Sequence, residues 1–571
     1  MFNVIPKDPA IFMNWSWPQL NPYYQDLIAR ELDELNIDQF LRDWTRLIDL
    51  VSEIYARVSV SVTSDTMDEK AEKNYNRFLE QVYPESQAAN QQLKEKLLIS
   101  GLEPDGFQNP LRKMRAEAEI YRSVNLPLLT EERKMGQEYN KIIGAQSVRW
   151  RGDELTLQQL RPHMQTQDRQ SRERIWRSAA ERQLADRQII NDLWIKQIAT
   201  RIQLAKNADL PNYRAYRWAQ MTRLDYTPED CLHFHRAIEA VAVPAATRLY
   251  EKHRNLLGVE KLRPWDLDLD LYPLHLPPIS PYGKVDILPI KAENIFSKVA
   301  PILGEYFHVM REDNLLDLEN RKGKAPGAYC TNFPVIRRPY IFMNAVGMAT
   351  DVRTILHESG HAFHNFERFR LPYAQQRTPG LEFAEVASMG LELLASPYLM
   401  VDNGGFYKQE DAVRFRVQHL ERILAFWPYM AVVDAFQHWI YTHEDSASNP
   451  ANCDAKWYEL WLRFIPGVDW SGLEPEVMTG WHRKQHIHRA PFYYVEYGLA
   501  QLGAVQVWKH SLKDQAETVE NYRKALSLGG TATLPELYGT AGAKFAFDKK
   551  TLGKAVKLIE MKIQELESGE N

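Results

Sequence analysis

The chain has 571 residues and a formal net charge of -5, with 44% hydrophobic and 25% charged residues. This length can bury a large core. The nearly balanced charge gives no attraction to nucleic acid or to an anionic membrane surface, so neither is expected as a partner. Only three cysteines occur, which argues against a disulfide framework and favours a reducing compartment. Composition leaves the oligomeric state undetermined.

The N-terminal segment, Met1 to Trp17, lacks the basic stretch and apolar run of a secretory signal. No window approaches the roughly 18 apolar residues that a membrane-spanning helix requires. The most apolar candidate, residues 423–433, is short and contains Pro428, so we expect a buried helix there. We therefore expect a cytoplasmic protein that has no membrane partner.

The first half of the chain is predicted to be a helical scaffold. From about residue 23 to residue 250, apolar residues recur at three- and four-residue spacing, which is typical of helices that bury one face. Examples are Phe40, Trp44, Leu47 and Val51. Prolines interrupt this periodicity between residues 263 and 289 and predict an ordered connection. We assign residues 1–262 to an N-terminal lobe.

Residues 263–571 form the second predicted lobe. Helix is expected over 292–309, and strand-forming residues then predict a short antiparallel sheet over 328–344. Residues 351–570 return to helical periodicity, with breaks near 404, 466 and 529. The predicted fold is mostly α-helical, and we expect the two lobes to form one continuous body.

The segment 354–366 contains the motif His357-Glu358-x-x-His361. Residues four apart on a helix lie one turn above each other, so both imidazoles project from one face and can bind one zinc ion. Glu358 is rotated by about 100° from His357. It can lie beside the metal without binding it, where it can act as a general base toward water.

An exposed helix with solvated histidines is the alternative to a metal site, since chance also produces this motif. The neighbouring apolar residues argue against exposure, because they predict that the helix is buried. Buried histidine and glutamate side chains need partners, and a metal ion supplies one. The apolar neighbours are Ile355, Leu356, Ala362, Phe363 and Phe366.

A catalytic zinc ion needs a third protein ligand. About two dozen residues after His361, the segment 379–392 predicts a helix that carries Glu382, Glu385 and Glu392. This separation lets the first helix end and a second helix return across the site. Spacing alone does not choose among these carboxylates.

At this point the sequence resembles the thimet oligopeptidase and oligoendopeptidase F family of zinc peptidases. In that family, H-E-x-x-H is followed by a helix with the pattern E-x-x-S, which Glu385-Val-Ala-Ser388 matches. The resemblance implies one zinc ion per chain, held by His357, His361 and Glu385. Glu382 and Glu392 remain candidates for orienting the imidazole ligands.

Two upstream blocks, residues 327–334 and 339–344, look like the family's strand region, where an extended peptide pairs with a strand edge. A hairpin that merely covers the zinc helix is the alternative from the residues alone. The resemblance favours peptide contact. The expected substrate-binding residues are Tyr340, Phe342, Asn344 and Tyr493.

The block from His486 to Gly498 resembles the family's C-terminal histidine and tyrosine motif, whose side chains donate hydrogen bonds to the tetrahedral intermediate. His486 and His488 compete for the histidine role, and adjacent tyrosines leave the phenol assignment open. We favour His486 together with Tyr494 and Tyr497, which would share one helix face.

The family implies two helical lobes around a deep cleft and cleavage of internal bonds in short unstructured peptides. Glu358 would take a proton from the attacking water, while tyrosine and histidine stabilise the oxyanion. A zinc carboxypeptidase or dipeptidase on a related helical scaffold is the alternative enzyme. A catalytically silent peptide-binding protein is the alternative outside enzymes.

Overall fold

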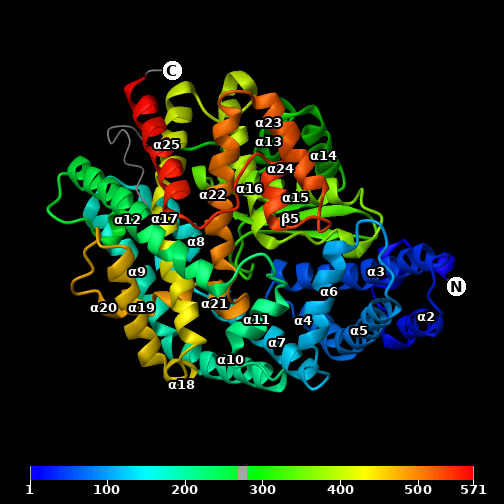
Figure 1. Cartoon of the computed structure of the whole chain (residues 1–571). Coiled ribbons are helices and arrows are strands. Elements are labelled where there is room, and N and C mark those ends of the chain that lie inside the picture. The colour runs from blue at the N-terminus through cyan, green and yellow to red at the C-terminus, as the bar shows by residue number, and fades with distance from the viewer. Residues whose placement is uncertain (1, 268–278, 570–571) are drawn as a thin grey trace.

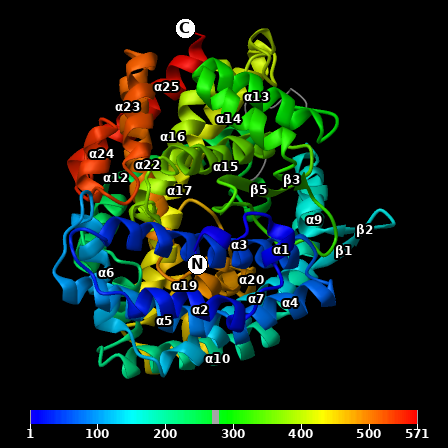
Figure 2. The ribbon, with the colours of Figure 1, turned by 90° about the vertical axis from the view of Figure 1, so that its right-hand side faces the viewer.

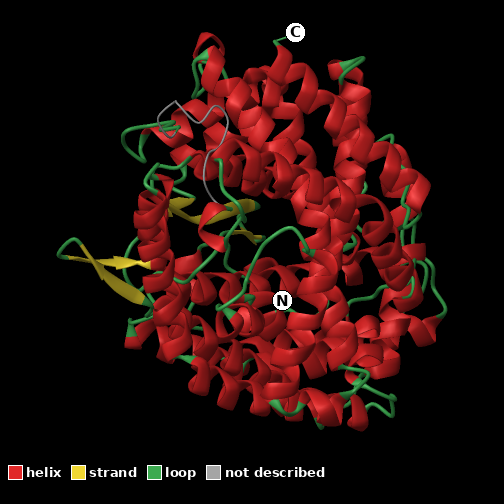
Figure 3. Cartoon of the chain, turned by 90° about the vertical axis from the view of Figure 1, so that its left-hand side faces the viewer, coloured by secondary structure: helices red, strands yellow, loops and turns green. Residues whose placement is uncertain are grey.

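The computed structural model describes residues 2–267 and 279–569. Helices make up most of these residues, and the strands form two small sheets (Figures 1 and 3). Residues 268–278 of the predicted connection lie outside the described part of the chain. Within those described ranges, no helix has the length and apolarity needed to cross a membrane.

The helices before residue 258 form the blue-to-green half of Figure 1 and agree with the periodicity over residues 23–250. They are α1 (Pro9–Phe12), α2 (Trp17–Ala29), α3 (Ile37–Ser64), α4 (Glu69–Gln81), α5 (Tyr83–Ser100), α6 (Gln108–Ile120), α7 (Asn125–Gly144), α8 (Leu157–Leu160), α9 (Arg169–Ala185), α10 (Arg187–Asn207), α11 (Tyr213–Gln220) and α12 (Pro228–Leu257).

The helices after residue 286 include the two that carry the predicted zinc ligands. They are α13 (Ile287–Val299), α14 (Pro301–Glu312), α15 (Ala349–Arg368), α16 (Leu381–Ala395), α17 (Gln409–Ile440), α18 (Glu444–Ala447), α19 (Pro450–Phe464), α20 (Glu474–Met478), α21 (Gln485–Arg489), α22 (Tyr494–Ser511), α23 (Gln515–Ser527), α24 (Leu534–Thr540) and α25 (Lys549–Ser568).

One helix was expected over residues 292–309. The structure has two helices there, because the helical conformation is interrupted at Ala300. Its φ of -160° and ψ of 137° are extended. The following residue is Pro301, whose ring disfavours the helical conformation of the residue before it. A proline at the first position of a helix is well tolerated, so α14 begins at once.

A hairpin within the first half was missed by the helical prediction. Strands β1 (Ser147–Trp150) and β2 (Asp153–Thr156) pair antiparallel. Between them, Arg151 and Gly152 have φ of 54° and 98°. A two-residue turn with positive φ at both central residues has a twist that suits a hairpin. Glycine adopts positive φ at little steric cost.

The small sheet predicted near the motif helix is present, and it packs against α15. Its strands are β3 (Leu316–Glu319), β4 (Tyr329–Phe333) and β5 (Arg338–Ala345), in the order β3-β5-β4. β4 pairs antiparallel with β5 as expected, whereas β3 pairs parallel with it. The sheet is therefore mixed, and β5 is its central strand.

The layers are visible in Figure 2, where α13 to α16 and the small sheet lie above α2, α3, α5 and α7. One large apolar cluster extends from Ala56 to Leu566 and so crosses the predicted boundary at residue 262. The segment 423–433 lies within α17 as a mostly buried helix, and Pro428 is buried there. The prediction of a mostly helical fold with a small sheet is confirmed.

A buried carboxylate ties the first helices to the sheet. Glu53 of α3 has no exposed surface, and its Oε2 accepts hydrogen bonds from the backbone amides of Val335 and Ile336 at 2.7 and 3.3 Å. Its other oxygen accepts from Arg57 at 2.8 Å. The turn between β4 and β5 is thus held by a helix nearly 300 residues earlier.

The helices α15 and α16 approach each other closely at Gly360, within the H-E-x-x-H motif. A Cβ atom at this position would lie 2.5 Å from the carbonyl oxygen of Ala387 and 2.5 Å from the Cα of Ser388. Because these are backbone atoms, a side chain there could fit only if the helices moved apart. Glycine therefore sets the spacing between the two helices.

Gly360→Ala should lower the free energy of unfolding by about 1–3 kcal/mol, the range for overpacking a well-packed core. Gly553→Ala is the matched control, because that glycine lies inside α25 with no atom within 4 Å of the added Cβ. It should raise the stability by about 0.4–1 kcal/mol. Urea unfolding of both variants tests this, and equal stabilities would contradict the proposed spacing role.

Candidate active site

Two helices bring His357, His361 and Glu385 together. The histidines lie one turn apart on α15, and the carboxylate comes from α16 (Figure 1). Glu385 Oε2 lies 3.3 Å from His357 Nε2 and 3.5 Å from His361 Nε2. Their ligand atoms all lie within 4.8 Å of one another.

This arrangement fits a zinc ion. With metal–ligand bonds of about 2.0–2.2 Å, two ligands of a tetrahedral zinc stand about 3.3–3.6 Å apart. The carboxylate oxygen stands at that spacing from both imidazoles. The histidine side chains are 20% and 18% exposed, whereas that of Glu385 is 2% exposed. The two imidazoles therefore keep some contact with solvent, whereas the carboxylate is enclosed.

Glu385 is fixed by two hydroxyl groups. Ser388, the serine of the E-x-x-S pattern, lies 3.0 Å from Oε2, and Tyr493 donates to Oε1 at 2.7 Å. Sequence analysis expected Tyr493 to contact substrate, but the structure places its hydroxyl on this carboxylate. Burial raises the pKa of Glu385, yet the facing histidines outweigh it and hold the pKa well below its usual range.

Glu392 orients the first histidine from the other side. Its Oε1 lies 2.7 Å from His357 Nδ1, and its Oε2 lies 3.0 Å from His419 Nε2. Despite burial, these two histidines lower the pKa of Glu392 to about 2. Burial lowers the pKa of His357, but hydrogen bonds to Glu385 and Glu392 outweigh it and raise the pKa well above its usual value.

His419 was not found by sequence analysis. It lies on α17, and neither a motif nor helical spacing connects it to the zinc helix. Glu382, the other proposed orienting carboxylate, has a different environment. It accepts a hydrogen bond from Tyr226 at 2.5 Å and lies 3.5 Å from the Arg223 guanidinium. Its side chain is therefore directed to the loop between α11 and α12.

Glu358 is the buried carboxylate of the group with a free oxygen. It is 5% exposed, and its Oε2 has no hydrogen-bond partner among the described residues. Burial raises its pKa, although the charges of His357 and His361 oppose the shift. An unpartnered oxygen with raised proton affinity suits a group that takes a proton from water.

The C-terminal block separates the competing residues. His486 Nε2 lies 3.2 Å from the Tyr497 hydroxyl, whereas His488 is wholly buried, stacks on Tyr139 and contacts Gln197 at 2.9 Å. Burial, followed by the Lys484 charge, lowers the pKa of His486 to about 3. This imidazole is therefore neutral near pH 7.

The two tyrosines of α22 also differ. Tyr494 is 6% exposed, and its hydroxyl accepts a hydrogen bond from Lys484 at 3.2 Å. Tyr497 is half-buried, and burial together with the Glu385 and Glu358 charges raises its pKa well above the usual value. Tyr497 thus stays protonated near pH 7 and can donate a hydrogen bond.

The strand residues have unequal access to a substrate. Phe342 is fully buried and stacks on Tyr329, with ring centroids 4.7 Å apart. Tyr340 is half-buried, and Asn344 donates from Nδ2 to the carbonyls of Ala325 and Gly327. Since β5 is the central strand, the free edges of this sheet belong to β3 and β4.

Two cavities border the region. One of about 340 Å³ is lined by Arg353 and His419, near the carboxylate that orients His357. Another cavity, of about 500 Å³, lies between the small sheet and helices α8 and α9. Its lining includes Gln158, Gly327, Asn344 and Arg483.

Comparisons with known proteins find similar peptidases. PZ peptidase A, solved with an inhibitor, is 26% identical over 99% of both chains, with a TM-score of 0.91. Oligopeptidase PepF of Bacillus subtilis (strain 168) is 25% identical over 54% of this chain and 46% of its own length. Plasmid-encoded oligoendopeptidase F of Lactococcus lactis subsp. cremoris is 23% identical over 66% and 60%.

The chain thus matches about half of the length of the curated relatives. The model of peptidase family M3 matches residues 163–556, which include every candidate ligand of the zinc site. The resemblance to thimet oligopeptidase and oligoendopeptidase F is confirmed by these matches. The chain belongs to peptidase family M3.

Proposed function

We propose that this protein is a zinc-dependent endopeptidase that hydrolyses internal bonds of short unstructured peptides. One observation carries the proposal: Glu385 Oε2 stands 3.3 and 3.5 Å from two imidazole nitrogens, beside a buried Glu358 whose Oε2 has no partner in the described part of the chain. Ligands on one side and a base on the other are the groups that metal-assisted hydrolysis requires.

His357, His361 and Glu385 would hold one zinc ion at this site. When bound, zinc supplies a Lewis acid for the scissile carbonyl and acidifies the attacking water. Glu392 holds the His357 ring through Nδ1, which leaves Nε2 free to bind metal. Ser388 and Tyr493 hold the Glu385 carboxylate in a single orientation.

Glu358 acts as the general base. Its Oε2 accepts a proton from the attacking water and then passes it to the nitrogen of the leaving amine. The buried position makes a free carboxylate more basic than it would be in water, so proton uptake is favourable. Among the described residues, the buried Glu496 also has an oxygen without a hydrogen-bond partner, but its other oxygen pairs with Arg223 at 2.6 Å.

Tyr497 donates its phenolic hydrogen to the carbonyl oxygen as negative charge develops there. The neutral His486 lies 3.2 Å from that hydroxyl and orients it or shares its hydrogen bond. Tyr494, whose hydroxyl faces Lys484, serves the packing of α22 instead.

Peptide binding is assigned to the region below the zinc helix. Asn344 lines the cavity of about 500 Å³, and β4 offers a strand edge to an extended backbone. We place the boundary between the two lobes near residue 262, with a deep cleft between them that excludes folded proteins. Tyr340 contributes a half-buried ring to the same sheet.

Glu358→Gln should retain zinc and lower turnover of an internally quenched peptide by about 10²- to 10⁴-fold, the contribution of a positioned base. Glu367→Gln is the matched control, since that buried glutamate lies on the same helix and pairs with Arg523. It should keep most of the turnover. Near-normal turnover by Glu358→Gln would show that the base is a different group.

Amidation of the peptide C-terminus tests the endopeptidase assignment with the wild-type protein. Cleavage at internal bonds should continue, because an endopeptidase does not require a free carboxylate. Complete loss of cleavage would instead identify a strict carboxypeptidase. A protein that binds zinc but cleaves neither the amidated nor the unmodified peptide would be a catalytically silent peptide-binding protein.

Tyr497→Phe should lower kcat and kcat/KM together by about 10²- to 10³-fold, because its hydrogen bond forms mainly in the transition state. Tyr494→Phe is the control, since its hydroxyl contacts Lys484. Steady-state kinetics of both variants give the comparison. A change confined to KM in Tyr497→Phe would contradict the oxyanion role.

Glu392→Gln should weaken zinc affinity by about 10- to 100-fold, the usual effect of removing a hydrogen-bond partner of a ligating histidine. Glu382→Gln alters a carboxylate of the same helix that contacts Tyr226, and should leave zinc affinity nearly unchanged. Competition with a fluorescent chelator measures both affinities. Equal losses would reject Glu392 as the specific partner of His357.

A further inference from the structure

A second cluster of metal-ligand side chains lies away from the active site, between α12 and α17. Cys231 and His235 are four residues apart on α12, and Asp434 and His438 are four residues apart on α17. Each pair therefore stands on one face of its helix. The two helices pack against each other, and the four residues are at most 5% exposed.

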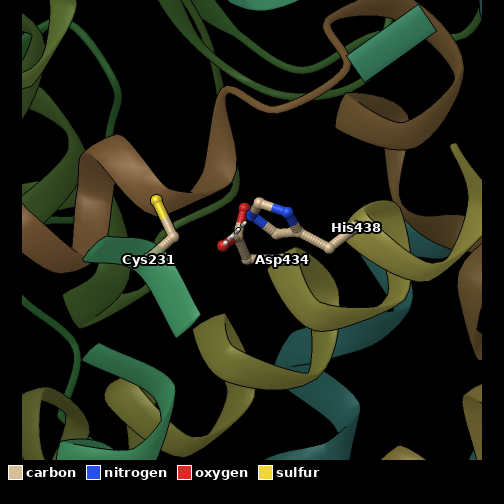
Figure 4. Close-up of side chains that lie close together, drawn as sticks. All are labelled: Cys231, Asp434 and His438. Carbon is tan, nitrogen blue, oxygen red and sulfur yellow. Dashed lines mark ion pairs between the residues drawn. The ribbon is translucent and has the colours of Figure 1, made fainter. Parts of the chain in front are cut away.

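Three of these side chains lie close together. The ligand atoms of Cys231, Asp434 and His438 lie within 4.8 Å of one another (Figure 4). His438 Nε2 lies 3.3 Å from Asp434 Oδ2. His235 Nε2 lies closer to that oxygen, at 2.8 Å, and makes a hydrogen bond with it.

Two polar atoms of this cluster have no hydrogen-bond partner among the described residues. They are Asp434 Oδ1 and His438 Nε2, and both belong to side chains that are at least 95% buried. A buried polar atom without a partner costs free energy. His438 Nε2 has Asp434 Oδ2 at 3.3 Å, so Asp434 Oδ1 is the atom that most needs a further partner. A cation satisfies a carboxylate oxygen and an imidazole lone pair together.

We propose that Cys231, Asp434 and His438 bind a second divalent metal ion of the zinc type, with His235 orienting the aspartate. Thiolate, imidazole and carboxylate are the donors that zinc takes in proteins. Magnesium and calcium prefer oxygen ligands alone, so this donor set selects against them. His235 plays the part of the partner that holds a ligating carboxylate.

Binding at this position requires two local changes. The Cys231 thiol loses its proton to solvent, and its sulfur lone pair binds the metal. His438 Nδ1 then carries the ring hydrogen, so the Arg214 guanidinium, now 3.3 Å from that nitrogen, turns away. The Arg214 side chain is half-buried, so part of it contacts solvent.

The closed position indicates a structural ion. Its ligands are almost fully buried and join one helix from each side of residue 262. A metal here would clamp α12 of the first half to α17 of the second. Two zinc equivalents would then replace the single equivalent that the sequence motif predicts.

Cobalt substitution of the full-length wild-type protein tests the site without any mutation. A thiolate bound to Co²⁺ gives a charge-transfer absorption band in the near ultraviolet, and the active-site ligands contain no sulfur. We expect that band in the wild type and its loss in Cys231→Ser. Cys453→Ser, which changes another buried cysteine, should keep it. No band in the wild type, or a band that survives Cys231→Ser, overturns the proposal.

Zinc content of the purified protein separates this site from the active site. The wild type should hold two equivalents, and both His438→Gln and the double variant His357→Ala/His361→Ala should hold one. If the wild type held one zinc equivalent and the double variant none, the second site would be rejected and the zinc would be assigned to the active site. A single equivalent that is lost only in His438→Gln would reject the active-site zinc instead.

Discussion

At Gly360 the backbone of α15 stands so close to α16 that a Cβ atom would lie 2.5 Å from the Ala387 carbonyl oxygen. This contact determines where Glu385 can reach. With a larger residue at that position the two helices would separate, and the carboxylate would leave the pair of imidazoles. The motif's variable positions are thus under a packing constraint that is independent of the chemistry performed by its histidines and glutamate.

Burial gives the three carboxylates near the metal ligands different properties. Glu385 and Glu392 each face histidines, which outweigh the cost of burial and keep both groups ionised. Glu358 keeps one oxygen without a partner, and its proton affinity rises. Glu385 and Glu392 are therefore suited to stay ionised beside the histidines, whereas Glu358 is suited to exchange protons.

The sequence was sufficient for elements whose information is local. Helical spacing predicted α3, and the five-residue motif predicted a helix with both imidazoles on one face, whereas Glu385 was chosen through the family resemblance. Contacts between distant segments left no such pattern. His419 reaches Glu392 from α17, and the choice of Tyr497 over Tyr494 follows from where Lys484 lies. The β1–β2 hairpin was missed because the residues on both sides of its Arg151-Gly152 turn lie in a stretch of helical composition.

The contact between Glu53 and the turn after β4 has a consequence for the order of folding. The two partners are separated by 282 residues, so their meeting closes a very long loop of chain. During synthesis α3 is made before the strands, so Glu53 Oε2 cannot accept from the Val335 and Ile336 amides until that turn is made. A fragment beginning at residue 263 would in turn lack the acceptor for the Val335 and Ile336 amides. The turn between two strands of the sheet that packs against α15 is therefore held by a helix from the first half of the chain.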